Sequence, residues 1–363
     1  MRIALVGVGL IGGSIGLAAR RRLDATVAGY DTDPGALEVA RERGAIDRPA
    51  GSIADAVSDA EAVFVAVPVA RLPEAVKAAL SAAPEGCVVT DVGSTKRAIV
   101  AALDAGGGQS QFVGGHPLAG AETAGVRYAR EDLFEGATWY LTPTPTTSGI
   151  AYERLHRLLR ALGARPVAIE PEAHDTILAT VSHLPHVLAN VLVAQAAQTL
   201  RSGPHPPERL PATGPSFRDA TRVAGAPSAI WTDIYVSNRD ALVAGIDDTI
   251  ERLGAVRDAL ASADAGRITG WNDAAAADRR RLLEAQLAGG PLFELRASVP
   301  NRPGVVAQLA LELGRAGVNI TDMALYPAPD MSEGVVALWI AGEREAERTE
   351  ELVAQLGFPV ARA

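Results

Sequence analysis

Cysteine and lysine are almost missing from this chain of 363 residues, in which Cys87 is the one cysteine and Lys77 and Lys96 are the only lysines. A single cysteine excludes a disulfide framework and a cysteine-based zinc cluster within the chain. Cys87 lies in the apolar run "GCVVTDV", which favours a small buried side chain over a reactive thiol. This usage fits a reducing cytoplasm.

Positive charge is also in deficit, because 34 Lys and Arg face 43 Asp and Glu for a net charge of −9. Nucleic acids and anionic membranes bind basic surfaces, so we expect neither as a partner. The start "MRIALVGVG" shows no signal-peptide pattern. The apolar stretch "ILATVSHLPHVLANVLVAQAA" is interrupted by His183, His186 and Asn190, so we expect a buried helix rather than a membrane span. We therefore predict a cytoplasmic protein that acts on a small molecule.

Hydrophobic periodicity divides the chain into three predicted domains. Residues 1–170 alternate short β-branched runs with helical stretches, which predicts an α/β domain with a doubly wound, mostly parallel sheet of Rossmann type. Residues 171–288 carry long helical periods around a proline-rich interruption and predict an all-α domain. Residues 291–363 follow a βαββαβ order, which is typical of ferredoxin-like folds.

A glycine pattern follows the first predicted strand and opens a helix. Gly7 allows a tight turn, Gly9 lets backbone amides approach a pyrophosphate, and Gly12 lets the helix pack closely on the strand. Asp31 ends the second strand, where a carboxylate accepts hydrogen bonds from ribose hydroxyls and repels a 2′-phosphate. The pattern predicts NAD rather than NADP, bound at the helix N-terminus. The cofactor contacts expected in this turn are Gly7, Gly9, Leu10, Ile11 and Gly12.

Two further segments, "TDVGSTK" and "GGHPLAGAET", end strands of the same predicted sheet. The carboxyl ends of parallel strands face the ligand crevice, so Ser94 and His116 should both line it beside the cofactor. A serine after a glycine at a strand-to-helix turn also suits a helix cap, and the two roles are compatible for Ser94.

The helical part contributes "TVSHLPHVLAN", in which His183 and His186 lie three residues apart on one helix face. A zinc site would need a third ligand, but His174 is nine residues upstream and no HExxH pattern is present, so we predict no metal. Core or capping roles and substrate contacts both remain open for the two histidines.

The segment "GPSFRDATRVAGAPSAIW" places Arg218 and Arg222 on adjacent helical turns. An arginine in an otherwise small and apolar stretch is a candidate for bidentate binding of a carboxylate. Arg218 has Asp219 beside it as an internal partner, so Arg222 is the stronger candidate.

Taken together, residues 1 to about 285 resemble the prephenate dehydrogenase family. The resemblance rests on "GVGLIGGSIG", "DVGSTK", "GGHPLAGAE", "VSHLPH" and "FRDATRVA" in the family's order. The last part of the chain resembles an ACT domain, a small amino-acid-sensing module, in "VPNRPGVVAQLALELGRAGVNI".

The resemblance implies the oxidative decarboxylation of prephenate to 4-hydroxyphenylpyruvate with reduction of NAD, a step of tyrosine biosynthesis. His116 would accept the proton of the ring hydroxyl, a task that suits an imidazole of pKa about 6.5. Ser94 would hydrogen-bond that hydroxyl or His116. By the same resemblance His186 would contact the substrate side chain, His183 would lie nearer the nicotinamide, and Arg222 would bind a substrate carboxylate.

The ACT resemblance implies feedback regulation by L-tyrosine, although a purely structural dimerisation module is an alternative. The residues that would line the amino-acid site are Asn301, Arg302, Pro303, Gly304, Asn319 and Ile320. A helical domain rich in Ala and Leu also predicts a homodimer.

Other functions remain possible at this stage. An arogenate or cyclohexadienyl dehydrogenase would differ only in the substrate side chain, although no acidic residue obviously awaits an ammonium group. A β-hydroxyacid dehydrogenase would typically use a lysine in the helical domain, yet both lysines lie in the first domain. An NAD-bound amino-acid sensor would not need His116, His186 and Arg222 together.

Overall fold

The computed structural model describes residues 1–104, 109–120, 123–201, 214–284, 291–300, 305–318, 320–328 and 332–363. They fall into two units, Met1–Ile250 and Glu251–Ala363. The division lies inside helix α11 (Arg239–Ala261) and does not coincide with the boundaries of the three predicted domains, which remain predictions.

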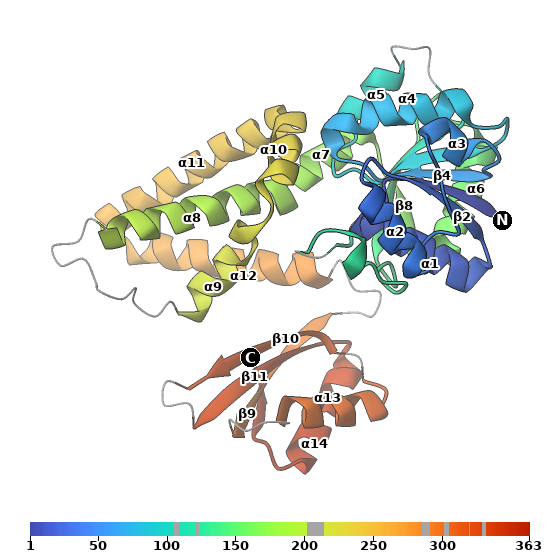
Figure 1. Ribbon diagram of the computed structural model, residues 1–363. Coiled ribbons are helices and arrows are strands. Elements are labelled where there is room, and N and C mark those ends of the chain that lie inside the picture. Colours follow the sequence, from blue (N-terminus) through green and yellow to red (C-terminus); the bar gives the residue numbers. More distant parts are fainter. Residues whose placement is uncertain are drawn as a thin grey trace. The chain divides into compact units, whose positions relative to one another are not determined.

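A sheet forms the centre of the first unit (Figure 1). It has eight strands in the order β3-β2-β1-β4-β5-β6-β7-β8. All neighbouring strands are parallel except β6 and β7. The predicted Rossmann-like, mostly parallel sheet is therefore confirmed, and its chain order changes direction between β1 and β4, where such folds bind ligands. The strands are β1 (Arg2–Val6), β2 (Thr26–Tyr30), β3 (Arg48–Pro49), β4 (Ala62–Val65), β5 (Val88–Asp91), β6 (Phe112–Pro117), β7 (Thr138–Thr142) and β8 (Arg165–Ala168).

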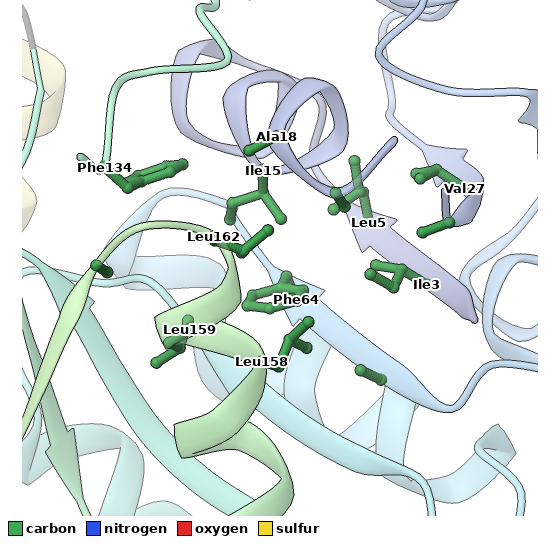
Figure 2. Close-up of a cluster of buried hydrophobic side chains, with 14 of the residues drawn as sticks. Ile3, Leu5, Ile15, Ala18, Val27, Phe64, Phe134, Leu158, Leu159 and Leu162 are labelled. Atoms are coloured by element: carbon green, nitrogen blue, oxygen red, sulfur yellow. The ribbon is translucent and has the colours of Figure 1, made fainter. Parts of the chain in front are cut away.

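Both faces of this sheet are buried because successive strand residues point to opposite sides. On β1, Ile3 and Leu5 join a core with Ile15 and Phe64 (Figure 2), whereas Val6 joins a second core on the other face. The connecting helices are α1 (Leu10–Leu23), α2 (Pro34–Glu42), α3 (Ile53–Val57), η1 (Val69–Arg71), α4 (Leu72–Ala82), α5 (Arg97–Asp104), η2 (Val126–Tyr128) and α6 (Gly149–Ala161).

Between residues 171 and 284, every regular element in the described part of the chain is helical, as predicted. These elements are α7 (Pro171–Leu178), η3 (Ala179–His183), α8 (Leu184–Arg201), α9 (Pro215–Thr221), η4 (Arg222–Gly225), α10 (Ser228–Ser237), α11 and α12 (Ala265–Glu284). The segment η3 is a π-helical turn that joins α7 to α8, and such turns occur frequently at functional sites.

The continuous helix Pro171–Arg201 is long and apolar enough to cross a membrane by length and composition alone. The expectation that its polar residues disqualify it was therefore wrong on that criterion. The expectation of a buried helix was wrong as well, because only 28% of its apolar window is buried in this structure. In this structure its first turns are hydrogen-bonded to the sheet domain, since Asp175 accepts from the backbone N–H of Lys96.

The second unit contains an antiparallel four-stranded sheet in the order β10-β11-β9-β12. One face packs on helices through Leu295, Leu309 and Val353. The other face carries Trp339, which packs near Leu283 of α12 and lies under the guanidinium of Arg279 at 5.7 Å from the ring centre. The elements follow the predicted order, β9 (Leu292–Pro300), α13 (Val305–Arg315), β10 (Ile320–Pro327), β11 (Glu333–Ala341), α14 (Glu343–Gln355) and β12 (Val360–Arg362).

Candidate active site

The turn from β1 to α1 has no room for a side chain at two of its glycines. A Cβ on Gly7, whose φ is +95°, would lie 2.4 Å from the carbonyl oxygen of Ala66, and a Cβ on Gly12 would lie 2.0 Å from that of Gly7. A Cβ on Gly9 would meet no atom within 4 Å, so space is open at the N-terminus of α1. Gly9 is the N-cap and has no side chain to satisfy the first backbone N–H groups of the helix. This open, amide-lined turn fits a phosphate group.

Asp31 follows β2 and holds the same turn in place. Its Oδ2 accepts from the backbone N–H of Val8 at 2.9 Å, and its Oδ1 accepts from that of Asp33 at 3.0 Å. Each carboxylate oxygen has a second lone pair, so the group can still accept from a ribose hydroxyl. Leu10 and Ile11 pack partly against the core of the sheet domain.

A buried carboxylate ties together the two strand ends that carry Ser94 and His116. Asp91 is the last residue of β5. Its carboxylate accepts from the backbone N–H of Gly115 at 3.1 Å and from that of Gly93, in the loop after β5, at 2.9 Å. The ammonium of Lys96 pairs with it, and both side chains are fully buried. The loop bearing the half-buried Ser94 is thereby fixed beside the strand bearing His116.

His116 is 8% exposed and belongs to a chain of hydrogen bonds. Its Nδ1 lies 2.9 Å from Nε2 of His174, whose Nδ1 lies 2.8 Å from Oδ1 of Asp175. Asp175 also accepts from the backbone N–H groups of Lys96 at 2.7 Å and Arg97 at 3.0 Å. Burial alone would raise the pKa of Asp175, but the hydrogen bonds from His174, Arg97 and Lys96 outweigh it and hold that pKa below its usual value.

Burial lowers the pKa of His116 well below 6.5, and His174, Lys96 and His183 act in the same direction. The sequence-based expectation of a base that titrates near working pH therefore needs correction. His116 is held neutral at pH 7, with a lone pair available to accept a proton.

His183 lies in the π turn η3 and joins the same buried network. Its Nδ1 is 3.2 Å from Nδ2 of Asn238. That Nδ2 also donates to the backbone carbonyl of Asp175 at 2.7 Å, and Oδ1 of Asn238 accepts from the guanidinium of Arg97 at 2.9 Å. Burial lowers the pKa of His183 to about 4. The structure thus brings His183 into the surroundings of His116.

His186 lies one turn further along, in an aromatic cluster of α8 and α10. Its ring stacks on Trp231, with ring centres 3.6 Å apart and planes 10° apart. Its Nδ1 is hydrogen-bonded to the hydroxyl of Tyr235 and lies 3.3 Å from Nδ2 of Asn190. Burial lowers the pKa of this imidazole too.

Arg222 begins η4 and is exposed, and η4 packs against α8, the helix that carries His186. Arg218 and Asp219 are exposed on α9. The structure thus places Arg222 near the helix of the aromatic cluster rather than in the buried network of Asp175.

Comparisons with known proteins decide the family. Residues 15–168 match the family model described as prephenate dehydrogenase, nucleotide-binding domain, and residues 170–271 match prephenate dehydrogenase, dimerization domain. The chain belongs to the prephenate dehydrogenase family. It is accordingly an oxidoreductase with a nucleotide-binding and a dimerization region.

Individual members of the family resemble the chain over most of its length. The prephenate dehydrogenase of Bacillus subtilis is 33% identical over 97% of this chain and 95% of its own length. The cyclohexadienyl dehydrogenase of Zymomonas mobilis is 34% identical over 72% of this chain and 89% of its own.

Among solved structures, Aquifex aeolicus prephenate dehydrogenase in complex with hydroxyphenyl propionate and NAD+ has a TM-score of 0.70 at 29% identity, covering 78% of this chain and 98% of its own. Synechocystis arogenate dehydrogenase has a TM-score of 0.67 at 27% identity, covering 78% and 100%.

Sequence reasoning did not assign a site role to three buried polar residues of this candidate site, namely His174, Asp175 and Asn238. It weighed His174 only as a metal ligand, and the described residues include no group of three or more metal-ligating side chains. The available signal was the dipeptide His174-Asp175 near the start of an apolar helix, where two polar side chains need buried partners.

Five of the six residues expected to bind an effector lie outside the described residues, namely Asn301, Arg302, Pro303, Gly304 and Asn319. Ile320 begins β10 and packs partly against the core of the second unit.

Proposed function

We propose that this chain oxidatively decarboxylates prephenate to 4-hydroxyphenylpyruvate with NAD as hydride acceptor, as a cytoplasmic enzyme of tyrosine biosynthesis. The observation that carries the proposal is a buried, neutral His116 at the carboxyl edge of a Rossmann-like sheet, in a chain of the prephenate dehydrogenase family.

The β1–α1 turn holds the cofactor in this proposal. The open space at Gly9 and the free amides of α1 receive the pyrophosphate, while Asp31 accepts from the ribose and disfavours a 2′-phosphate. NAD supplies the hydride acceptor when bound. Ser94, on the loop fixed by Asp91, would help to hold the cofactor beside His116.

His116 acts as the base. It takes the proton of the ring hydroxyl as hydride leaves the same carbon, and it returns that proton to the oxygen once carbon dioxide has left and the ring is aromatic. Ser94 hydrogen-bonds the hydroxyl or His116 and so aligns the pair. Because aromatisation favours the products, the protein has to supply alignment and one proton acceptor.

The substrate contacts are assigned to His183, His186 and Arg222. The flat surface of His186 stacked on Trp231 suits an unsaturated ring or its side chain. Arg222 offers a guanidinium on the neighbouring η4 for a substrate carboxylate. An arogenate substrate is the alternative, since relatives in the family include a cyclohexadienyl and an arogenate dehydrogenase.

The two remaining parts of the chain are assigned to assembly and regulation. The helical region forms a homodimer, in keeping with its match to a dimerization domain. The second unit's sheet order β10-β11-β9-β12, with two helices on one face, is the ferredoxin-like arrangement. We assign it as an ACT domain that binds L-tyrosine.

Steady-state kinetics on two substrates and two cofactors test the function. Purified full-length protein is given prephenate or L-arogenate with NAD or NADP, and cofactor reduction is followed by absorbance. We expect the highest kcat/KM for prephenate with NAD. Reduction with arogenate alone would replace the substrate assignment, and absence of turnover with both ring acids would refute the function.

A further inference from the structure

Asp175, His174 and His116 form one unbroken chain of hydrogen bonds between helix α7 and strand β6. The distances are 2.8 Å from Asp175 to His174 and 2.9 Å from His174 to His116. Asp175 and His174 are fully buried. The proposed function uses only the last member of this chain, so the other two have no assigned role.

The position of each proton in this chain of hydrogen bonds follows from the carboxylate of Asp175 at one end of it. Apart from His174, the Asp175 carboxylate accepts three N–H groups, two of them from Arg97, and they hold its pKa below the usual value. It is therefore ionised and acceptor-only, so the Nδ1 of His174 must donate to it. A neutral His174 then has its lone pair on Nε2. Because that atom faces Nδ1 of His116, the proton between the two rings belongs to His116.

The alternative is a doubly protonated His174, which would force the proton of His116 onto its other nitrogen. Arg97 already pairs with Asp175, with Nε at 3.4 Å from Oδ2. A charged His174 would bring a second cation to one carboxylate, close to the buried ammonium of Lys96. Neutral His174 avoids that cost.

We propose that His174, anchored by Asp175, is a positioning residue that keeps the proton of His116 on Nδ1 and thereby leaves Nε2 as the atom that accepts the substrate proton. The proposal rests on the proposed function, because it names the groups that prepare its base. Tyr140 packs edge-on against His174 at 5.6 Å between ring centres, which fixes the ring further.

The same chain stabilises His116 once it has taken the proton. The O–H bond of the substrate breaks, an N–H bond forms at Nε2, and the resulting imidazolium donates from Nδ1 to His174. The titratable groups around it are His174 and His183, which are neutral in this arrangement, and the ammonium of Lys96, which opposes the positive charge. The carboxylate of Asp175 favours that charge through His174. The proton later returns to the product oxygen, so the three side chains end the catalytic cycle in the protonation states in which they began.

Three variants of the full-length protein separate positioning from folding. His174→Leu removes both hydrogen bonds of the ring. His174→Gln keeps an oxygen that can accept from Nδ1 of His116 but loses the coupling to Asp175. Thr176→Ala, an exposed neighbour on α7 whose hydroxyl bonds only within that helix, is the matched control.

The kinetic readouts are kcat, KM and the pH profile with prephenate and NAD. We expect His174→Leu to lower kcat by about tenfold to a hundredfold with KM within about twofold, His174→Gln to recover part of that loss, and Thr176→Ala to match the wild type. In Asp175→Asn the acid limb of kcat should move to lower pH, because the lost carboxylate no longer stabilises the imidazolium.

The nitrogen-15 shifts of the His116 ring report the tautomer without any substrate, assigned by comparison with His116→Asn. We expect Nδ1 protonated and Nε2 bare in the wild type, and a mixture of both forms in His174→Leu. A proton on Nε2 in the wild type, or a His174→Leu enzyme with wild-type kcat and pH profile, would overturn the proposal.

The spectrum needs no turnover, so the tautomer can be confirmed even if the proposed function fails. The failure of one is therefore distinguishable from the failure of the other. If His174→Leu does not fold, the wild-type spectrum and His174→Gln still decide.

Discussion

At the scale of single residues, burial sets the chemistry of the histidines in this site. An imidazole in water titrates near pH 6.5. Burial moves the pKa of His116 well below that value and the pKa of His183 to about 4. In the proposed mechanism His116 therefore starts each turnover as a neutral acceptor. Both rings resist protonation in the folded protein.

The depressed pKa of His183 makes folding stability depend on pH. The unfolded chain binds a proton near pH 6.5 and the folded chain only near pH 4, so the unfolded state holds more protons between these values. This contribution to stability is fully present above pH 6.5 and is lost as pH falls towards 4, by up to about 3 kcal/mol.

The variant His183→Asn tests this dependence, because its side-chain oxygen can accept from Asn238 and does not titrate. We expect a shallower fall of the thermal midpoint between pH 6.5 and 4 than in the wild type, with similar midpoints at pH 8. Parallel pH profiles for the two proteins would show that His183 is not the titrating group.

At the scale of elements, the glycines of the β1–α1 turn are required for different physical reasons. Gly7 and Gly12 face backbone atoms, whereas Gly9 faces open space. Loss of Gly12 should therefore act on the fold, and loss of Gly9 on the bound nucleotide.

The pair Gly9→Ala and Gly12→Ala separates these effects. We expect Gly9→Ala to keep the wild-type thermal midpoint and to weaken NAD binding at least about tenfold, since its methyl group enters the phosphate space. Gly12→Ala should destabilise the protein by about 1–3 kcal/mol, because its Cβ overlaps a carbonyl. Differential scanning fluorimetry and calorimetric titration with NAD measure both; equal loss of stability in the two variants would contradict the assignment.

Local patterns predicted most of the elements and the residues at strand ends. Alternating β-branched runs located seven strands of the sheet, and the glycine spacing located the β1–α1 turn. The strand β3 escaped because it has two residues, one of them Pro49, and carries no period. His174 escaped because its partner His116 is 58 residues away, and only the packing of α7 against β7 and α5 brings the rings together.

At the scale of the whole molecule, the last strands and helices belong to the same unit as the end of the helical region. Leu283 and Arg279 of α12 pack on the sheet face that carries Trp339. Removing residues 291–363 would strip this face from α12 and would test stability as well as regulation. Point variants in the full chain are therefore the better probe of an effector.

L-Tyrosine should bind the full-length protein and inhibit prephenate oxidation. We expect Asn319→Ala to weaken tyrosine binding by about tenfold, the loss of about one hydrogen bond, with uninhibited kcat unchanged. Gln355→Ala, exposed near the end of α14, is the control and should bind as the wild type does. Calorimetric titration measures both, and absence of tyrosine binding to the wild type would leave the ACT-like unit a structural module.

The central claim is that the buried His116 is the base of a prephenate dehydrogenase, and the most direct measurement is NAD reduction by prephenate in the wild type and in His116→Asn. The account predicts turnover by the wild type and a kcat lower by about 10²- to 10⁴-fold in the variant, with prephenate binding retained. Wild-type turnover in His116→Asn would contradict it.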